Sequence, residues 1–168
     1  HLTRGVHAKA SKAKDGTEGP LNCAACHGDK AHGILPVSDP RSPVRLGSQV
    51  DACGRCHEKE LAEYEVSVHG HGLRHSGLRS AVCADCHGAH AIYDASEDAS
   101  TLHSTNVADT CAKCHRFINE RLMQSVHGRG VGLGTVTDEP APGGDVKRRP
   151  SCTDCHQGHD LPDPRTGE

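Results

Sequence analysis

The ten cysteines of this sequence fall into five Cys-x-x-Cys pairs, and a histidine directly follows each pair. The five motifs are Cys23/Cys26/His27, Cys53/Cys56/His57, Cys83/Cys86/His87, Cys111/Cys114/His115 and Cys152/Cys155/His156. Two thiols at this spacing can form thioether bonds to the vinyl groups of one haem, and the adjacent imidazole reaches the iron from the same face. The pattern predicts five covalently attached c-type haems, with the cysteines as attachment points and the motif histidines as proximal iron ligands.

Paired cysteines are also typical of zinc sites and of disulfide frameworks. Both interpretations leave the histidine after each pair unexplained. Histidine makes up 15 of 168 residues, so its presence after all five pairs by chance has a probability of roughly 10⁻⁵ to 10⁻⁶. The haem interpretation is therefore favoured over the other two.

A six-coordinate haem iron needs a second axial ligand, and histidines outside the motifs can supply it. The predicted distal ligands are His7, His32, His69, His90 and His127. Spacing along the chain pairs His32 with His57 and His90 with His115, because both separations are 25 residues. His7 precedes His27 by 20 residues and would pair with it, while His69 and His127 fit either the haem before them or the haem after them.

His159 occupies the same place after its motif as His90 does, but a haem 25 residues further on would lie beyond residue 168. Two interpretations follow. In the first, His159, or His7 from the other end, binds an iron in a neighbouring chain and links subunits head to tail. In the second, His159 is a vestigial or ordinary exposed histidine.

An internal repeat organises the chain. A shift of 58 residues superposes the second motif on the fourth, and Ser67-Val68-His69-Gly70 on Ser125-Val126-His127-Gly128. The repeat predicts one domain over 1–168, built from two and a half two-haem modules at about 7–68, 69–126 and 127–168. An insertion of 11 residues between His127 and Cys152, rich in glycine and proline, predicts a surface loop.

The composition limits the fold. With 34% hydrophobic residues, 2% aromatic residues and no tryptophan, the chain has too few apolar side chains for an ordinary core. We expect a mostly irregular chain with a few short α-helices wrapped around a stack of haems, and little or no β structure. Apolar periodicity predicts helices over 58–68 and 116–126, and residues 1–20 should be irregular unless something ties them down.

Composition and charge also exclude some classes of protein. The formal net charge of −3 and the lack of a basic stripe or aromatic platform argue against nucleic acid as a partner. No apolar run is long enough for a transmembrane helix. Because haem is attached to such motifs outside the cytoplasmic membrane, and the sequence starts at His1 as a processed chain would, we expect an exported protein in the periplasm or outside the cell.

The motif with a histidine three residues later, as in Cys83-Ala-Asp-Cys-His-Gly-Ala-His90, resembles multihaem c-type cytochromes of respiratory and extracellular electron transfer. The chain is similar to small periplasmic electron shuttles and to subunits of extracellular cytochrome filaments. The resemblance implies irons with two histidine ligands and haems in alternating parallel and T-shaped pairs. In the filaments it also implies head-to-tail homopolymers in which a histidine of one subunit binds a haem iron of the next.

The expected function is electron transfer without catalysis, and the expected partners are other redox proteins or copies of the same chain. One alternative is a multihaem oxidoreductase that acts on nitrogen or sulfur oxyanions at one haem with an open coordination position. Sensing of a ligand at one haem is a further alternative.

Overall fold

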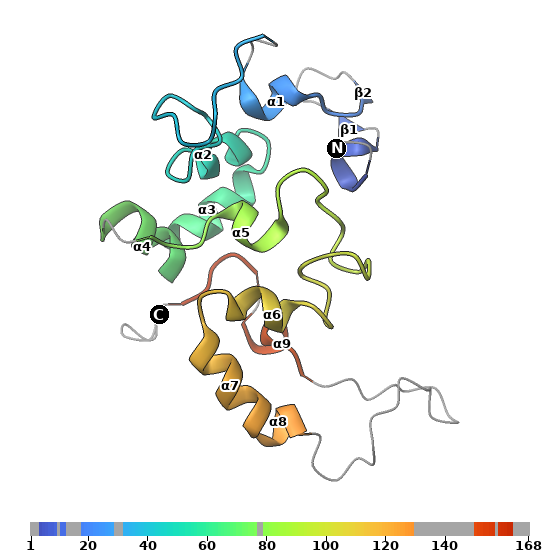
Figure 1. The fold of residues 1–168 in the computed structure, drawn as a ribbon, viewed down its shortest axis with the longest axis vertical. Coiled ribbons are helices and arrows are strands. Elements are labelled where there is room, and N and C mark those ends of the chain that lie inside the picture. The colour runs from blue at the N-terminus through green and yellow to red at the C-terminus, as the bar shows by residue number, and fades with distance from the viewer. Residues whose placement is uncertain are drawn as a thin grey trace.

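Short helices and long irregular connections make up the fold (Figure 1). The computed structural model describes residues 4–9, 11–12, 18–28, 32–76, 79–129, 150–156 and 158–162. A 3-10 turn over Val6–Ala8 is followed by β1 (Ser11–Lys12), β2 (Glu18–Gly19), α1 (Cys23–His27), α2 (Gln49–Gly54), α3 (Glu58–Val66), α4 (Val68–His75), α5 (Cys83–His87), α6 (Val107–Ala112), α7 (Arg116–Gln124), α8 (Val126–Arg129) and α9 (Cys152–Cys155). The expectation of a helical and irregular chain with little β structure is confirmed, and the predicted glycine- and proline-rich loop lies outside the described residues.

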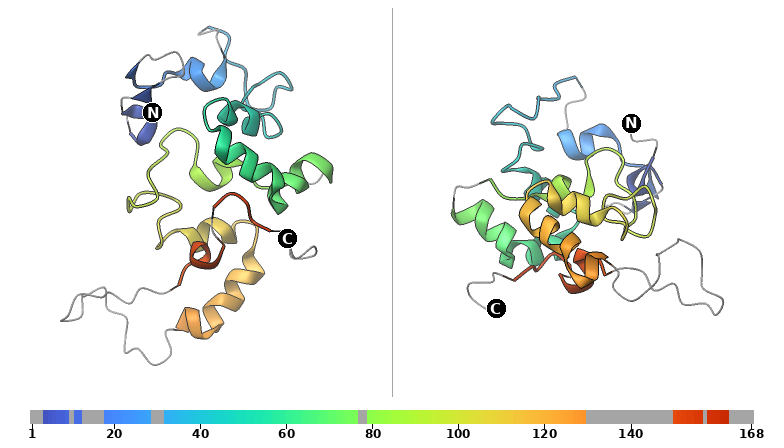
Figure 2. Two further views of the ribbon diagram at one scale, coloured as in Figure 1. Left: turned by 180° about the vertical axis from the view of Figure 1, so that it is seen from behind. Right: turned by 60° about the horizontal axis from the view of Figure 1, so that its bottom comes forward.

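The helices that carry the cysteine motifs follow one another along the longest axis of the molecule. Figure 1 shows α1 at one end, then α2, α5 and finally α6 beside α9. Helices α3 and α4 lie beside α5, and α7 and α8 extend from α6 to the other end. The view from behind in Figure 2 shows the same order, with the C-terminal segment passing between α6 and α4.

Hydrogen bonds of the backbone recur at the spacing of 58 residues. The Ser42 amide donates to the Asp39 carbonyl at 2.9 Å, and the Ser100 amide donates to the Glu97 carbonyl at 2.8 Å. Both serines are buried, with 1% and 3% of their surface exposed. The connections before α2 and α6 therefore fold in the same way, although few of their side chains are alike.

The two longest predicted helices end earlier than their apolar pattern suggests. Helix α3 ends at Val66 and α7 ends at Gln124, two residues short of the predicted boundaries. Ser67 and Ser125 follow, each with an extended backbone, and a new helix begins at the next residue. Serine is a favourable residue before a helix because its hydroxyl accepts a hydrogen bond from a free amide of the first turn.

The N-terminal arm, predicted to be irregular, is tied to the rest of the chain. The Val6 amide donates to the Ile92 carbonyl at 2.7 Å, and the Leu21 amide donates to the His7 carbonyl at 3.0 Å. Strands β1 and β2 pair as a two-residue antiparallel ladder. Contacts with residues of the second module thus hold the arm in place.

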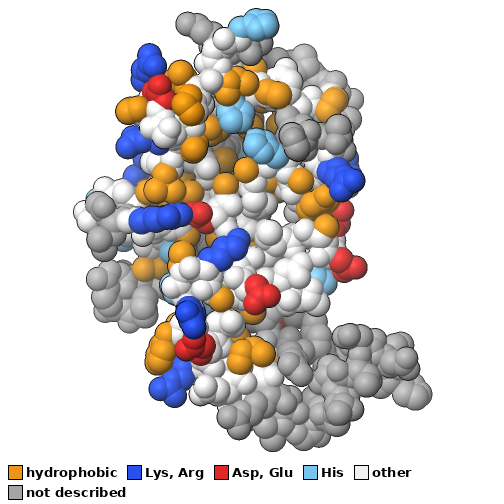
Figure 3. All heavy atoms as spheres, viewed as in Figure 1, with side chains coloured by type: hydrophobic (Ala, Val, Ile, Leu, Met, Phe, Trp, Pro, Cys, Tyr) orange, Lys and Arg blue, Asp and Glu red, His pale blue; other side chains and the backbone are white. Residues whose placement is uncertain are grey.

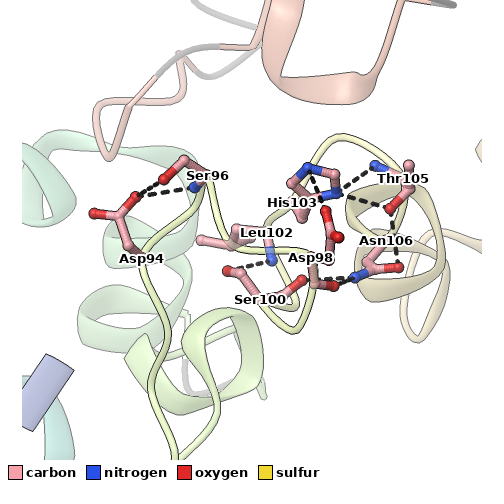
Figure 4. A network of polar contacts seen from close by, with 8 residues as sticks. All are labelled: Asp94, Ser96, Asp98, Ser100, Leu102, His103, Thr105 and Asn106. Carbon is pink, nitrogen blue, oxygen red and sulfur yellow. Dashed lines mark hydrogen bonds and ion pairs between the residues drawn. The ribbon is translucent and has the colours of Figure 1, made fainter. Parts of the chain in front are cut away.

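The loop that leads into α6 is held by its own polar side chains (Figure 4). The Asn106 side-chain amide donates to the carbonyls of Asp98 and Ser100, at 2.8 Å in both cases. His103 Nδ1 lies 2.8 Å from Thr105 Oγ1, and its Nε2 lies 3.5 Å from an Asp98 carboxylate oxygen. His103 is therefore bound within its own loop and is placed to stabilise it.

Few apolar side chains are buried among the described residues. These are Val50, Tyr64, Val82 and Val107, with exposed fractions of 0 to 8%. Many hydrophobic side chains lie instead at the surface, together with histidines (Figure 3). Side chains of this number cannot stabilise a chain of this length by themselves.

Candidate functional site: four facing histidine pairs

Four motif histidines each face a histidine from another part of the chain. The ring centroids are 6.0 Å apart in three pairs and 5.9 Å apart in the fourth. The pairs are His27 with His90, His57 with His7, His115 with His69, and His87 with His159. Each pair contains one motif histidine and one histidine outside the motifs.

His90 and His159 face the histidines of the first and third motifs. Each lies three residues after the histidine of a later motif. Between the two histidines the chain passes through a glycine with a positive φ angle, 76° at Gly88 and 69° at Gly158. Glycine adopts this conformation without steric cost, so the chain can turn sharply after each motif helix and present its histidine to the preceding odd-numbered motif.

His69, which faces His115, is positioned by the residues around it. The buried Ser67 hydroxyl donates to the Tyr64 carbonyl at 2.6 Å and accepts a hydrogen bond from the Gly70 amide at 3.1 Å. A Cβ atom at Gly70 would collide with the Tyr64 carbonyl oxygen. The Ser-Val-His-Gly sequence therefore packs the start of α4 closely against the end of α3 and holds His69 at its second residue.

The relative orientation of the rings divides the pairs into two classes. The ring planes are 19° apart in the His27–His90 pair and 25° apart in the His87–His159 pair. They are 56° apart in the His57–His7 pair and 44° apart in the His115–His69 pair. The first and third motifs thus have nearly parallel rings, whereas the second and fourth motifs have tilted ones.

The ring separation fits a metal ion held between two imidazoles. A metal–nitrogen bond of about 2.0 Å on each side, with about 1.1 Å from each nitrogen to its ring centre, places the centroids about 6 Å apart. Two imidazoles on opposite sides of a haem iron have these dimensions. The residues present therefore fit an iron with two histidine ligands at four of the five motifs.

Burial favours the neutral form of several of these imidazoles. Desolvation lowers the pKa of His7, His69 and His87, and the facing histidine of each pair lowers it further. A neutral imidazole is the form that binds a metal.

Carboxylates approach two of the rings from the side of Nδ1. His159 Nδ1 lies 3.5 Å from Glu63 Oε2, and His57 Nδ1 lies 3.9 Å from Glu60 Oε2. Histidines that bind a metal commonly direct their other ring nitrogen to a carboxylate, which fixes the ring orientation. This arrangement leaves Nε2 of both histidines available.

Cysteines of consecutive motifs lie next to each other. Cys53 and Cys83 share a hydrogen bond that lowers the pKa of Cys53 and raises that of Cys83. Burial, together with the neighbouring Cys152 thiol, raises the pKa of Cys111 to about 11. Cys26 interacts electrostatically with Cys53 and Cys56, and Cys86 interacts with Cys114. The five motifs thus follow one another in space in the order of the sequence.

The second cysteine of a motif is not always part of a motif helix. Helices α1, α5 and α9 contain both cysteines of the first, third and fifth motifs, whereas α2 ends at Gly54 and α6 ends at Ala112. Cys56 and Cys114 therefore lie in the turn that follows, where each amide donates to the carbonyl of the first cysteine of its motif at 3.2 Å. Both thiols are exposed. The role predicted for Cys56, a thioether bond to the second haem, stays a prediction.

All ten cysteines are free thiols in this structure. Among the residues that the structure describes, no three histidine, cysteine or acidic side chains converge on one point. The four ligands of a structural zinc site are therefore not assembled in the described part of the chain.

The structure pairs the distal histidines differently from their spacing along the chain. His90 faces His27 rather than His115, and His57 faces His7 rather than His32. Equal separations in sequence reflect the repeat, whereas the spatial pairs join different modules or opposite ends of one module.

His159 faces a histidine of its own chain. The sequence left open whether it binds an iron in a neighbouring chain or is exposed, and its ring lies 5.9 Å from that of His87. The signal that identifies this pair is the equal spacing of His90 and His159 after their motifs.

Three predicted site residues stand outside the four pairs, namely His32, His127 and His156, and all three are exposed. His71 and His75 lie one turn apart on α4 with their rings 5.6 Å apart. Neither belongs to a motif, and neither is part of the four pairs.

No family model, curated protein or solved structure matches this chain. Among its described residues, no helix combines the length and apolar character needed to cross a membrane.

Proposed function

We propose that this chain binds five c-type haems and transfers electrons along them. The observation that carries the proposal is the set of four histidine pairs, each with one motif histidine and one distal histidine about 6 Å apart. The motif alone predicts the attachment of a haem, but it does not require a second histidine on the opposite side. Unrelated surface histidines would not be expected to form four pairs at this separation, each with one motif histidine.

In this proposal each residue type has one task. The ten cysteines tether the haems, the motif histidines bind one side of each iron, and the distal histidines bind the other side. A bound haem iron supplies a one-electron couple between the ferric and ferrous states. With two histidines to hold each of four irons, these irons would have no position left for a substrate, as suits electron transfer without catalysis.

The arrangement of the motifs supports a linear path. Thiols of the second and third motifs are in contact, as are thiols of the fourth and fifth. Haems attached at neighbouring thiols must lie close to each other, so an electron can pass between them in short steps. The first and fifth motifs, near α1 and α9, are the ends of this path.

The small core is also consistent with the proposal. Haems at the five motifs would cover apolar side chains that are exposed in the protein part alone, and their porphyrin rings would supply the buried apolar surface that four side chains cannot. The chain would then be exported, as haem attachment requires, and would exchange electrons with other redox proteins or with copies of itself, either as a diffusing shuttle or as a filament subunit.

One observation favours a second function. His156 belongs to none of the four pairs, so its iron has no partner histidine among the four distal histidines identified. An open position at one iron is what a multihaem reductase of nitrogen or sulfur oxyanions, or a sensor of a small ligand, would require.

The proposal is tested on the protein produced in a host that attaches haem c. Intact mass and the absorbance of the pyridine complex should give five haems per chain, and replacement of Cys111 and Cys114 by serine should leave four. Electron paramagnetic resonance of the ferric protein should show low-spin centres at the four pairs. Fewer than five haems in the unaltered protein, or high-spin iron at those four motifs, would contradict the proposal.

Carbon monoxide distinguishes the two functions. The reduced protein of an electron carrier in which a histidine also completes the iron at His156 should bind none. Uptake at one haem in five would favour the enzyme or the sensor.

A further inference from the structure

The odd-numbered motifs of this chain are joined by a repeated junction. His90, which follows the third motif, faces His27 of the first motif, and His159, which follows the fifth motif, faces the histidine of the third. In both cases the histidine that lies three residues after one odd-numbered motif faces the motif histidine of the preceding odd-numbered motif. The nearly parallel rings of both pairs indicate that the two junctions have the same geometry.

A backbone hydrogen bond accompanies each junction. The Val6 amide donates to the Ile92 carbonyl at 2.7 Å, and the Val68 amide donates to the Leu161 carbonyl at 2.9 Å. Ile92 and Leu161 each lie two residues after the distal histidine of their junction. The two valines each precede a histidine in the segment before an odd-numbered motif. One junction therefore consists of a histidine pair and a hydrogen bond from a valine.

The fifth motif carries one half of a third junction. Val126 is the counterpart of Val68, its side chain is 64% exposed, and no backbone acceptor for its amide occurs among the described residues. His156 is the counterpart of His27 and His87, and it is outside the four pairs. The Val126 amide and His156 are thus both present, but no segment with a distal histidine and an accepting carbonyl faces them among the described residues.

The other half is found next to the first motif. His32 and Ile34 have the same spacing as His90 and Ile92, and as His159 and Leu161. His32 is exposed and belongs to none of the four pairs, and Ile34 is 46% exposed. The segments at His90–Ile92 and at His159–Leu161 each complete a junction within the chain, and the segment at His32–Ile34 is their third counterpart.

Exposed apolar side chains accompany both halves. On α7, next to Val126, Phe117 and Ile118 are each 62% exposed and Met123 is 52% exposed. The equivalent residues of α3, whose module has its junction completed, are Lys59, Glu60 and Glu65. Near the other half, Val37 is 63% exposed. Apolar surface on α7 in place of charged residues is typical of a helix that packs against a partner.

We propose that the segment His32–Ile34 of a second copy of this chain docks on Val126 and the fifth motif. The Ile34 carbonyl of one copy accepts the hydrogen bond from the Val126 amide of the other, and His32 becomes the second ligand of the iron at His156. The proposal rests on the proposed function, since it needs an iron at the fifth motif. It places the contact between copies at His32, whereas the sequence had raised His159 as one candidate for such a contact.

His127 of the same chain is the competing ligand. Its counterparts, His7 and His69, face the second and fourth motifs, not the first or third. By this pattern His127 does not face an odd-numbered motif such as the fifth, and both even-numbered motifs already have their partners in His7 and His69. The iron at His156 is therefore left to His32.

The two docking surfaces differ from each other, so the contact is heterologous. Contacts of this kind repeat from copy to copy and produce either a closed ring or an open filament. Each contact would bring the first motif of one copy close to the fifth motif of the next and continue the electron path.

The test compares three variants of the haem-loaded protein with the unaltered protein. His32→Ala removes the docking ligand, His127→Ala is the matched control, and Val126→Pro removes only the amide donor. Proline is tolerated at Val126 because this is the first residue of α8 and the preceding Ser125 is extended, with φ −80° and ψ 172°. The measurements are the molar mass by analytical ultracentrifugation and the spin state of the ferric haems.

The unaltered protein should associate and have five low-spin haems. With His32→Ala, association should be lost and one haem in five should become high-spin, and added imidazole should return that haem to low spin without restoring association. Val126→Pro should weaken association, and His127→Ala should change neither property.

Three results would overturn the proposal: a monomeric unaltered protein, five low-spin haems in His32→Ala, or a high-spin haem in His127→Ala instead. The haem count and the low-spin signal of the other four haems are measured in the same samples. If these fail, the proposed function fails; if they hold while association does not depend on His32, only the docking proposal fails.

Discussion

Replacement of Ser67 by alanine tests how the Ser-Val-His-Gly sequence holds His69. The hydroxyl is fully buried and is the acceptor for the Gly70 amide, so Ser67→Ala leaves a buried amide without a partner. The loss of a helix-capping serine costs about 1 kcal/mol, and an unsatisfied buried amide costs about 1–3 kcal/mol. Because these two costs overlap, we expect the free energy of unfolding to fall by about 2 kcal/mol. The Tyr64 carbonyl contributes little, since it keeps the hydrogen bond from the Ser67 amide.

The second copy of the sequence provides a matched comparison. Ser125 is only partly buried, and its hydroxyl accepts from the Gly128 amide at 3.4 Å instead of 3.1 Å. Ser125→Ala should therefore cost about 1 kcal/mol or less, and the exposed Ser38→Ala should cost nothing measurable. Guanidinium denaturation of the haem-loaded protein, followed by circular dichroism, measures the three midpoints. Equal midpoints for Ser67→Ala and Ser38→Ala would refute the role assigned to the Ser67 hydroxyl.

Three further predictions concern single positions. His90→Met should keep the iron of the first motif six-coordinate but raise its potential, because a thioether ligand favours the ferrous state; a redox titration with five unchanged potentials would show that His90 is not a ligand. Gly70→Ala should lower the denaturation midpoint and disturb one haem, since its Cβ meets the Tyr64 carbonyl, whereas Gly47→Ala, which meets no atom within 4 Å, should have no such effect. Burial raises the pKa of Tyr64 from 10.0 to about 12. The cost of burying the ionised phenol is therefore absent below pH 10 and lowers the free energy of unfolding as the pH rises from 10 to 12. Tyr64→Phe should remove this part of the alkaline loss in stability, and an unchanged pH profile would contradict the assignment.

The motifs and the repeat are properties that the sequence determines by itself. The proposed attachment of a haem by two cysteines and the next histidine would depend on residues within a few positions of each other, such as Cys83 to His87, and would need no information from the rest of the chain. The local backbone is less uniform than the motif, because Cys56 lies in a turn after α2 while Cys86 lies inside α5. The helices after the second and fourth motifs were predicted because their apolar pattern is local. Their ends were misplaced by two residues, since the serine that caps the next helix competes with the continuation of the first.

The low content of apolar residues also indicated that the chain would have short helices, little β structure and a very small core. Val50 and Val107 are buried as parts of helices that carry a motif cysteine, but composition alone does not identify them. The short strands β1 and β2 were not predicted, because a two-residue ladder has no periodic pattern in the sequence.

Only the tertiary structure decided which histidines face each other. The two rings of a pair such as His87 and His159 come from motifs dozens of residues apart, and their separation depends on how the modules pack. Spacing along the chain could not reveal which histidine faces which. A repeat gives the same sequence separations in every module, so it does not show against which module His90 packs. The turn at Gly88 and the hydrogen bond from Val6 to Ile92 bring the second module back onto the first. Local sequence therefore determines where the proposed haems would attach, and long-range packing determines which imidazole lies opposite each of the four paired motif histidines.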